Sequence, residues 1–303
     1  MRDQGRLDEA VACCRRALEL KPDFAVAHYN LGNALKDMGN LDEAAASYRR
    51  ALQLNPDFYE AQTNLGATLH DEGDLDEALA CYRRALELMP FFGEANSNRL
   101  YTLNFSADYD ARAIYEEHRR WNETVAEPLP QSIQGHSNDP TPDRRLRIGY
   151  VSPDFRSHPV GRFLLPLLES HDHRSVEVFC YASLAVPDSI TERCRAHADV
   201  WRNVLGLSDE QLANTIRQDQ IDILVDLTMH MGGSRLLAFA RKPAPVQVTY
   251  LAYCGTTGLR TIDYRLTDPY LTHRARPSAC IPNSRFGCRK RIGAISRSPR
   301  RRR

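Results

Sequence analysis

The stretch GNLDEAAASYRRALQLNPDF, from Gly39 to Phe58, decides the fold of the first part of the chain because it recurs on both sides. Its opening returns as GRLDEA at Gly5–Ala10 and as GDLDEA at Gly73–Ala78, and its last four residues return as KPDF at Lys21–Phe24. Every recurrence lies 34 residues from its counterpart. A period of this length indicates a stack of similar units, since one unit alone cannot bury its apolar face.

A 34-residue period with this content is the tetratricopeptide pattern, in which each repeat forms two antiparallel helices. Gly32 and Ala44 are small where the two helices of a pair must approach closely. Tyr48 and Leu52 lie on one helix face at i, i+4 spacing. The chain begins at the second helix of a repeat, so we expect an array shortened at its N-terminus.

The first helix of the repeats carries an asparagine at matching positions, Asn30 and Asn64. Stacked repeats form a concave surface that binds peptides or proteins, and these amides are suited to hydrogen-bond an extended peptide backbone. A solvated polar face is the alternative. We expect the repeats to bind a protein or peptide, with Asn30 and Asn64 as the candidate contacts.

The repeat pattern decays after Glu94 and gives way to an amphipathic helical segment over Asp108–Ala126. The following stretch, EPLPQSIQGHSNDPTPDRR, is rich in Pro, Ser, Asn and Asp, which indicates a linker. The expected domains are therefore the repeats with adjoining helices at 1–125, a linker at 126–145 and a second domain at 146–271.

Short β-rich segments alternate with helical segments after the linker. The expected strands are LRIGYVS (Leu146–Ser152), VEVFCYA (Val176–Ala182), IDILVDL (Ile221–Leu227) and VQVTYLAY (Val246–Tyr253). The helical stretches between them are GRFLLPLLESH, SITERCRAHA and SDEQLANTIRQD, of which the last opens with a Ser-x-x-Gln capping box. This alternation predicts a parallel sheet with right-handed crossovers, a Rossmann-like α/β domain.

Three loops follow predicted strands at their carboxyl ends, where open parallel sheets bind ligands. PDFRSHP carries His158, TMHMGG carries His230, and CGTTG carries Thr256 and Thr257. Each loop also has a plainer interpretation: a turn histidine, a histidine that packs between two methionines, and a glycine-rich turn. Their convergence on one edge of the sheet favours a binding site there.

Composition places the chain among ordinary globular proteins, with 42% hydrophobic and 26% charged residues. No segment approaches the roughly 20 apolar residues of a membrane span, and the N-terminus has no apolar signal-peptide core. We therefore expect a cytoplasmic protein without a membrane partner. None of the eight cysteines forms a CxxC pair and no His/Cys cluster has zinc spacing, which predicts reduced, mostly buried thiols and no metal site.

Charge is distributed unevenly along the chain. From Arg274 onward there are ten Arg, one Lys and no acid, so this segment carries +11 and the preceding 273 residues carry −10. The tail at 272–303 has no hydrophobic period, and we expect it to be disordered or the product of a shifted reading frame. A tail that binds nucleic acid is the alternative, which the lack of an aromatic stacking pattern disfavours.

The motifs LRIGYVSPDFRSHPVGRFL, VEVFCYA, DILVDL, RKPAPVQVTYLAYCGTTG and DYRLTDPYL follow the repeats and EEHRRW in order. Over about residues 5–271 the chain resembles the bacterial O-linked N-acetylglucosamine transferase family, including its SPINDLY-like members. The resemblance implies a GT-B glycosyltransferase with two facing Rossmann-like lobes. Such an enzyme transfers a sugar from a nucleotide sugar, typically UDP-GlcNAc, to Ser or Thr hydroxyls with inversion and without a metal or other cofactor. The repeats would bind the protein acceptor.

Candidate site residues follow from the same resemblance. His158 matches the family's histidine after the first catalytic strand, which acts as a base or as a positioning residue. The family's LGYPG loop, which lines the sugar pocket, corresponds to LAYCG at 251–255. The expected substrate-binding residues are His230, Leu251, Ala252, Gly255, Thr256 and Thr257.

Two of these loops depart from the family pattern. Ala252 and Cys254 stand where the family has Gly and Pro, and Met229 and Met231 flank His230 where the pattern is closer to Gly-His-Thr. After DPYL the resemblance stops, although the family continues for about another domain length. We therefore expect the nucleotide-binding lobe to be missing and this chain alone to be inactive. A repeat protein that binds partners as an adaptor, without catalysis, is the alternative function.

Overall fold

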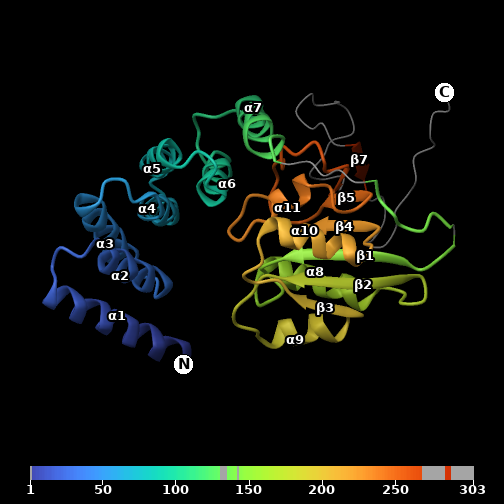
Figure 1. Cartoon of the computed structure of the whole chain (residues 1–303), viewed down its shortest axis with the longest axis horizontal. Coiled ribbons are helices and arrows are strands. Elements are labelled where there is room, and N and C mark those ends of the chain that lie inside the picture. Colours follow the sequence, from blue (N-terminus) through green and yellow to red (C-terminus); the bar gives the residue numbers. More distant parts are fainter. Residues whose placement is uncertain (1, 130–134, 142, 268–283, 288–303) are drawn as a thin grey trace. The chain divides into compact units, whose positions relative to one another are not determined.

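The computed structural model describes residues 2–129, 135–141, 143–267 and 284–287. Contacts divide the chain into two compact units, Met1–Asp110 and Ala111–Arg303, which we call the repeat unit and the sheet unit. Figure 1 shows helices in the first unit and a sheet with helices packed on it in the second.

The repeat unit is built from antiparallel helix pairs. In its described residues the helices are α1 (Arg2–Leu20), α2 (Ala25–Asp37), α3 (Leu41–Leu54), α4 (Tyr59–Glu72), α5 (Leu75–Leu88) and α6 (Gly93–Thr102). Gly39 and Gly73 connect the helices of a pair and adopt φ values of 83° and 91°, a left-handed conformation that glycine reaches without steric cost. Asp74 then caps α5 by accepting a hydrogen bond from the Glu77 amide at 3.3 Å. The predicted tetratricopeptide fold is confirmed.

Close approach within each pair depends on one glycine and one tyrosine. A Cβ on Gly32 would lie 2.6 Å from the Tyr48 ring, and a Cβ on Gly66 would lie 2.8 Å from the Tyr82 ring. Both tyrosines are fully buried. The predicted role of Gly32 as the point of close helix approach is therefore confirmed, and the same contact returns one repeat later.

The sheet unit begins with α7 (Ala111–Trp121) and a π-helical turn, η1 (Asn122–Ala126). Its described strands are β1 (Leu146–Ser152), β2 (Val176–Ala182), β3 (Val200–Asn203), β4 (Ile223–Asp226), β5 (Val246–Thr249), β6 (Tyr264–Thr267) and β7 (Ser284–Gly287). The connecting helices are α8 (Pro159–Glu169), α9 (Ser189–Ala196), α10 (Asp209–Gln218) and α11 (Leu236–Ala240).

All strand pairs are parallel and the sheet order is β3-β2-β1-β4-β5-β6-β7. The first six strands follow the Rossmann order 3-2-1-4-5-6, so the predicted parallel α/β domain is confirmed. Four strands and three helices lie where the alternation predicts them. The sequence analysis missed β3, α11 and β6, which are short. β7 lies inside the tail for which no regular structure was expected, and the rest of 272–303 is outside the described residues.

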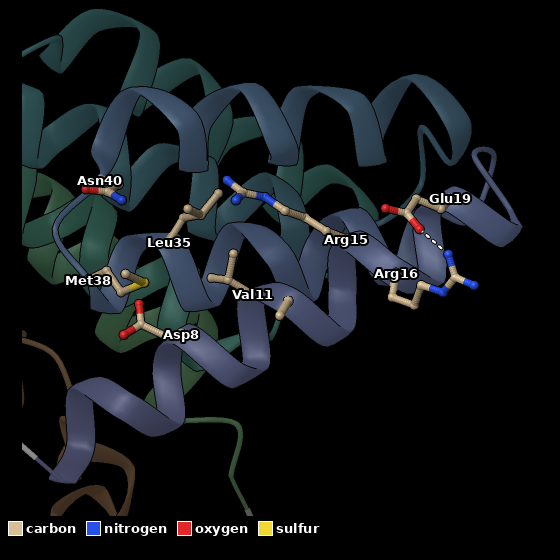
Figure 2. Close-up of a pocket in the computed structure, with 9 residues that line it drawn as sticks. Asp8, Val11, Arg15, Arg16, Glu19, Leu35, Met38 and Asn40 are labelled. Carbon is tan, nitrogen blue, oxygen red and sulfur yellow. Dashed lines mark hydrogen bonds and ion pairs between the residues drawn. The ribbon is translucent and has the colours of Figure 1, made fainter.

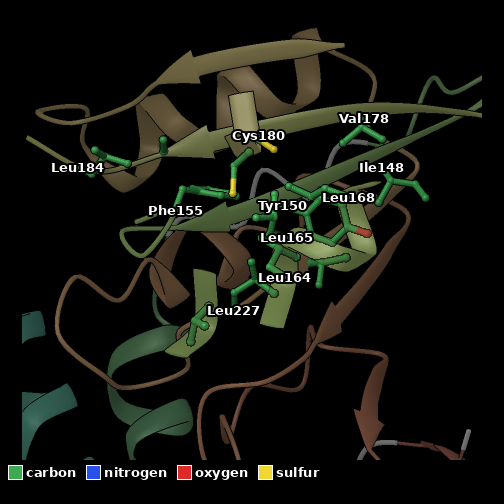
Figure 3. Packing of buried hydrophobic residues seen from close by; sticks show 14 of the residues in the cluster. Ile148, Tyr150, Phe155, Leu164, Leu165, Leu168, Val178, Cys180, Leu184 and Leu227 are labelled. Atoms are coloured by element: carbon green, nitrogen blue, oxygen red, sulfur yellow. The ribbon is translucent and has the colours of Figure 1, made fainter. Parts of the chain in front are cut away.

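The core of the sheet unit lies where α8 covers β1 and β2 (Figure 3). Leu164 and Leu168 are fully buried in the same cluster as Tyr150 of β1 and Val178 of β2. Strands buried on both faces read as continuous apolar runs, which is why LRIGYVS and VEVFCYA were recognisable. This packing fixes the start of α8 at the carboxyl end of β1.

The boundary between the units falls at Asp110/Ala111, earlier than the expected end of the first domain at 125. The helix predicted over 108–126 forms as α7 and η1, and it belongs to the sheet unit. Part of the expected linker is also fixed to this unit. Asp222 accepts hydrogen bonds from Asn138 Nδ2 at 2.8 Å and from Arg144 Nη1 at 2.7 Å. Burial would raise the pKa of Asp222, but these hydrogen bonds lower it below its ordinary value.

Candidate active site at the carboxyl edge of the sheet

The sheet changes its winding direction between β1 and β4. These two strands are neighbours in the sheet, but the chain leaves β1 toward β2 on one side and leaves β4 toward β5 on the other. In open α/β sheets such a switch point forms a crevice at the carboxyl ends of the strands. The loops that lie at this edge here are 153–158, after β1, and 227–235, after β4, and we use the word crevice for the edge between them.

His158 is the last residue of the first loop and the N-cap of α8. Its side chain is 33% exposed. The ring Nδ1 lies 3.3 Å from the Val160 amide, which donates to it, and 3.5 Å from Asp154 Oδ2. The Nε2 atom makes no hydrogen bond to any residue that the structure describes. His158 is therefore held at one nitrogen, while the other has no hydrogen-bond partner among the described residues.

The loop that carries His158 is anchored at both ends. Asp154 is 5% exposed, and its amide donates to Ser152 Oγ at 2.9 Å. The Ser157 amide donates to Asp188 Oδ2 at 2.6 Å, and Asp188 also caps α9. Burial would raise the pKa of Asp188, but these backbone hydrogen bonds lower it below its ordinary value. The position of His158 is thus set by β1, α8 and the start of α9 together.

A buried carboxylate, Asp226, ends β4 on the other side of the crevice. It accepts hydrogen bonds from the Thr228 amide at 3.1 Å, the Met229 amide at 3.0 Å and Thr249 Oγ1 at 2.9 Å. Complete burial nevertheless raises its pKa to about 6. The two amide bonds hold Met229 at a φ of 51°, a left-handed conformation that costs a side-chain-bearing residue free energy. Asp226 therefore fixes the shape of the second loop.

The structure corrects the assignment of His230 as a residue that faces substrate. Its side chain is fully buried, and Nε2 donates to the Thr257 carbonyl oxygen at 2.9 Å. The ring also packs edge-on against Trp121 and His118 of α7, with centroid distances of 4.6 and 5.1 Å. His230 joins the second loop to the third loop and to α7, which is the packing role that the sequence left open.

The third loop, 250–258, presents part of the predicted LAYCG segment. Leu251 and Ala252 adopt φ values of 62° and 59°, and both are half-buried. The left-handed backbone explains the family's glycine at the position of Ala252, because a Cβ is disfavoured there. Gly255 and Thr256 are also half-buried, whereas Thr257 is buried and its carbonyl is used by His230. Direct ligand contact is therefore open to Leu251, Ala252, Gly255 and Thr256.

Arg265 of β6 is a residue that the sequence analysis missed. It donates hydrogen bonds to the carbonyl oxygens of Tyr253, at 3.0 Å, and of Gly255. Two carbonyls of one loop are thus fixed by a single guanidinium group, whose fork of donors suits such a pair. The signal available in the sequence was an arginine between apolar residues in DYRLTDPYL, directly after the loop it holds.

In the repeat unit, Asn30 is exposed and Asn64 is half-buried. The Asn64 amide donates to Asn33 Oδ1 at 2.8 Å, and Tyr48 donates its hydroxyl to the same oxygen at 2.8 Å. Asn98 follows Asn64 at the same 34-residue spacing, a third member that the sequence analysis did not name. Asn30 is therefore the accessible amide of the predicted pair, and Asn64 takes part in a hydrogen-bond network between repeats.

Two hollows in the described residues lie away from His158. One, of about 520 Å³, is in the repeat unit, where Val11, Leu35 and Met38 meet charged side chains of α1 such as Asp8 and Arg15 (Figure 2). The other, of about 590 Å³, lies in the sheet unit between η1, the end of α11 and the segment 259–261. Neither includes a residue of the three loops at the crevice.

Within the described ranges, no group of three or more His, Cys, Asp or Glu side chains could hold a metal ion. The six described cysteines are free: Cys81, Cys180 and Cys194 are buried, Cys14 is half-buried, and Cys13 and Cys254 are exposed. No helix in the described part of the chain is both long enough and apolar enough to cross a membrane.

Family models match both units of the chain. The model for glycosyl transferase family 41 matches residues 112–276, and tetratricopeptide repeat models match residues 1–39, 25–58 and 59–92. The first match covers more than half of the chain and contains all three loops of the crevice. It begins within α7, in agreement with the division into units.

Curated relatives and a solved structure are similar to the same regions. A probable UDP-N-acetylglucosamine--peptide N-acetylglucosaminyltransferase SPINDLY of Solanum lycopersicum is 40% identical over 51% of this chain and 17% of its own length. The corresponding transferase of Caenorhabditis elegans is 40% identical over 41% of this chain and 11% of its own. A mutant O-GlcNAc transferase of Thermobaculum terrenum superposes with a TM-score of 0.85 at 40% identity, over 94% of this chain and 54% of that one. The chain thus spans about half of the solved relative and less than a fifth of the curated ones.

Proposed function

The chain belongs to glycosyl transferase family 41, and we propose that it supplies the acceptor side of a protein O-glycosyltransferase that moves a sugar from a nucleotide sugar to a Ser or Thr hydroxyl. The names of the relatives, which are UDP-GlcNAc–peptide transferases, support this reaction class. The observation that carries the proposal within the structure is the half-exposed His158 at the β1/β4 switch point.

The proposed reaction requires the removal of one proton from the acceptor. The Ser or Thr oxygen forms a bond to the anomeric carbon of the sugar, while the bond from that carbon to the phosphate oxygen breaks and the nucleoside diphosphate leaves with the electron pair. The hydroxyl proton moves to His158 Nε2, which has no other partner among the described residues. A positioned imidazole in this role contributes about 10²–10⁴-fold to the rate.

The sugar is proposed to lie against the third loop. Leu251, Ala252, Gly255 and Thr256 are half-buried there, and Arg265 holds the loop backbone in place. Backbone groups on a fixed loop recognise sugar hydroxyls without loss of side-chain entropy. His230 and Thr257 act behind this surface, where they support the loop instead of touching the sugar.

The repeat unit is proposed to bind the protein acceptor. Its helices form the stack that, in such repeats, provides an extended concave surface. Asn30 has an exposed amide for a peptide backbone, and Asn64 supports the same surface through its bond to Asn33.

The nucleotide part of the donor is proposed to bind a second lobe, and the proposal is supported by the solved relative being about twice as long as the region that this chain matches. Diphosphate leaving groups need cations or helix N-termini for charge stabilisation. The first loop contributes His158 and Arg156 as basic groups, whereas Arg235 of the second loop pairs with Asp209 and Arg265 is used by the third loop. This division of labour predicts that the 303 residues alone do not turn over donor.

The test uses two proteins: the 303-residue chain, and an extended chain in which residues 1–267 are followed by the unmatched half of the Thermobaculum terrenum relative. Each is incubated with radiolabelled UDP-GlcNAc and a Ser/Thr peptide. Label transfer by the extended chain and none by the 303 residues is expected. Transfer by the 303 residues alone would contradict the need for a second lobe, and a folded but inactive extended chain that binds donor and peptide would contradict the proposed reaction.

An adaptor function is the second candidate, and it is favoured by the compactness of the repeat unit on its own. Under this alternative, residues 1–110 would retain all partner binding. The extended chain would then bind UDP-GlcNAc through its added half but transfer no label to a bound peptide, whereas the transferase proposal requires transfer.

A further inference from the structure

Two groups compete for the same nitrogen of His158. The Val160 amide approaches Nδ1 at 3.3 Å as a donor, and Asp154 Oδ2 approaches it at 3.5 Å as an acceptor. A neutral imidazole carries one proton, so Nδ1 can accept from Val160 or donate to Asp154 but cannot do both. The choice also decides the state of Nε2, which carries the proton in the first case and a free lone pair in the second.

Asp154 is poorly satisfied by its other neighbours. It is 5% exposed, yet apart from His158 its side-chain contacts with donors in the described residues are long: Oδ1 lies 3.4 Å from Arg156 Nε and Nη2, on a side chain that is 54% exposed. By contrast, Asp188 accepts from three backbone amides, those of Ser157 in the first loop and of Ile190 and Thr191 in the first turn of α9. A buried carboxylate without strong donors gains most from an N–H directed at it, and a charge-assisted bond is stronger than a neutral one.

When Nδ1 no longer accepts from it, the Val160 amide gives up a long hydrogen bond of 3.3 Å, and as a first-turn amide of α8 it has no partner within the helix, so this loss opposes the effect of Asp154. The bond gained is charge-assisted, which is stronger than the neutral bond given up. If Nδ1 were unprotonated, its lone pair would instead face the Asp154 oxygen, which is a repulsive arrangement. Asp154 therefore favours the tautomer with the proton on Nδ1.

We propose that Asp154 is a positioning residue that keeps the neutral His158 protonated on Nδ1, so that Nε2 presents a lone pair to the crevice. This inference rests on the proposed function in one respect, namely that Nε2 receives the acceptor proton. When it does, the resulting imidazolium keeps its Nδ1–H directed at Asp154, and the new positive charge faces a buried negative one. A histidine that caps a helix in this way is prepared for proton transfer before substrate arrives.

The experiment is ¹⁵N NMR of the 303-residue chain labelled at histidine nitrogens, recorded at a pH where the rings are neutral. Long-range ¹H–¹⁵N correlations distinguish a protonated from an unprotonated ring nitrogen, and His158→Gln identifies the signals. The proton is expected on Nδ1 of His158 by at least about tenfold. Asp154→Asn is expected to shift the ratio toward Nε2, because a neutral amide oxygen accepts from Nδ1 less strongly than a carboxylate and the amide NH2 can donate to an unprotonated Nδ1.

Asp188→Asn is the matched control, since it removes a carboxylate that binds the same loop through Ser157 but does not face the ring. It should leave the tautomer unchanged. A wild-type His158 with its proton on Nε2, or an unchanged ratio in Asp154→Asn, would overturn the proposal. If Asp154→Asn does not fold, the wild-type tautomer alone decides.

The NMR result is independent of turnover. A confirmed tautomer together with full transfer activity in His158→Gln would remove His158 from the proposed reaction while leaving the role of Asp154 intact. If the proton of His158 is instead found on Nε2 while His158→Gln loses transfer activity, the proposed reaction stands and the positioning role of Asp154 is removed.

Discussion

The loops after β1 and after β4 border the same crevice and each carries a histidine, but the two side chains have opposite surroundings. His158 is 33% exposed and its Nε2 has no partner in the described part of the chain, whereas His230 is fully buried between α7 and the third loop. Topology brings the two loops to one edge, because parallel strands end together. It does not decide which side chain faces the crevice. That choice depends on α7, a helix more than a hundred residues before His230 in the chain.

The largest expected effect concerns activity and uses the extended chain. His158→Gln should reduce the turnover of label transfer by about 10²–10⁴-fold, because glutamine keeps the size and polarity of the ring but cannot accept the proton. Initial rates with radiolabelled UDP-GlcNAc measure this. His173→Gln, at the opposite edge where that ring contacts Asp199, serves as control and should keep its rate. Equal rates for both variants would remove the functional difference between the two loops.

The second effect concerns the stability that the buried histidine helps to provide. Trp121→Ala should lower the free energy of unfolding by about 3–5 kcal/mol, because it opens a cavity beside His230. Trp121→Phe is the matched control, since the indole Nε1 has no partner in the described structure, and a loss below about 1.5 kcal/mol is expected. Urea unfolding followed by circular dichroism gives both values. A small loss in Trp121→Ala would mean that α7 does not hold the second loop.

The sequence predicted the repeat unit well, because its information is local and periodic. Gly32 and Gly66, with Tyr48 and Tyr82, repeat one contact at fixed spacing, so a pattern alone indicates which side chains touch. Strands β1 and β2 were equally easy to predict from the sequence, since burial on both faces leaves long apolar runs. β3 (VWRN) and β6 (YRLT) each contain an arginine and have no long apolar run around them, whereas the equally short β4 and β5 lie within the apolar segments IDILVDL and VQVTYLAY.

The site was predictable only in part. The carboxyl edge follows from strand order, so the sequence could place His158 after β1, whereas its role at a site stays a prediction. The burial of His230 and the use of the Thr257 carbonyl depend on α7 and the third loop meeting in space. The hydrogen bonds of Arg265 and Asp226 likewise join residues distant in the sequence, and no single-chain pattern reports them.

The third effect is a pH dependence of the second loop. The pKa of Asp226 is raised from 3.8 to about 6 by burial, so the folded chain holds its proton more tightly than the unfolded chain. Its stabilising contribution is complete below pH 3.8 and is lost as the pH rises through about 6. Above that pH the ionised, buried carboxylate lowers the unfolding free energy of the wild type by about 3 kcal/mol. The uncharged side chain in Asp226→Asn does not carry this cost.

The difference in unfolding free energy between Asp226→Asn and the wild type should therefore change by about 2–3 kcal/mol in favour of the variant as the pH rises from 4 to 8. Denaturant unfolding of both proteins across this range gives the difference. Asp154→Asn, in the first loop, is measured in parallel as a control. It shows how much of the change comes from removing a carboxylate in general and how much is specific to Asp226. Profiles that stay parallel for Asp226→Asn would show that this carboxylate is ionised without cost.

The smallest effect concerns the strained backbone of the third loop. Ala252→Gly should raise the free energy of unfolding by about 1 kcal/mol, because φ is 59° and the side chain opposes that conformation. Ala213→Gly in α10 is the control with ordinary helical geometry, and it should lose about 1 kcal/mol or more. Thermal unfolding by calorimetry shows whether each variant is more or less stable than the wild type. A loss in Ala252→Gly would indicate that Cβ contacts of the alanine outweigh its strain.

The most direct test of the central difference is chemical modification of histidines in the native 303-residue chain. Diethyl pyrocarbonate acylates accessible imidazole nitrogens, and peptide mass spectrometry after short exposure gives a rate for each histidine. His158 is expected to be acylated rapidly through its free Nε2, and His230 only on unfolding. Protection of His158, or reaction of His230 at a comparable rate, would contradict the assignment of the loop after β1 as the open, reactive side of the crevice.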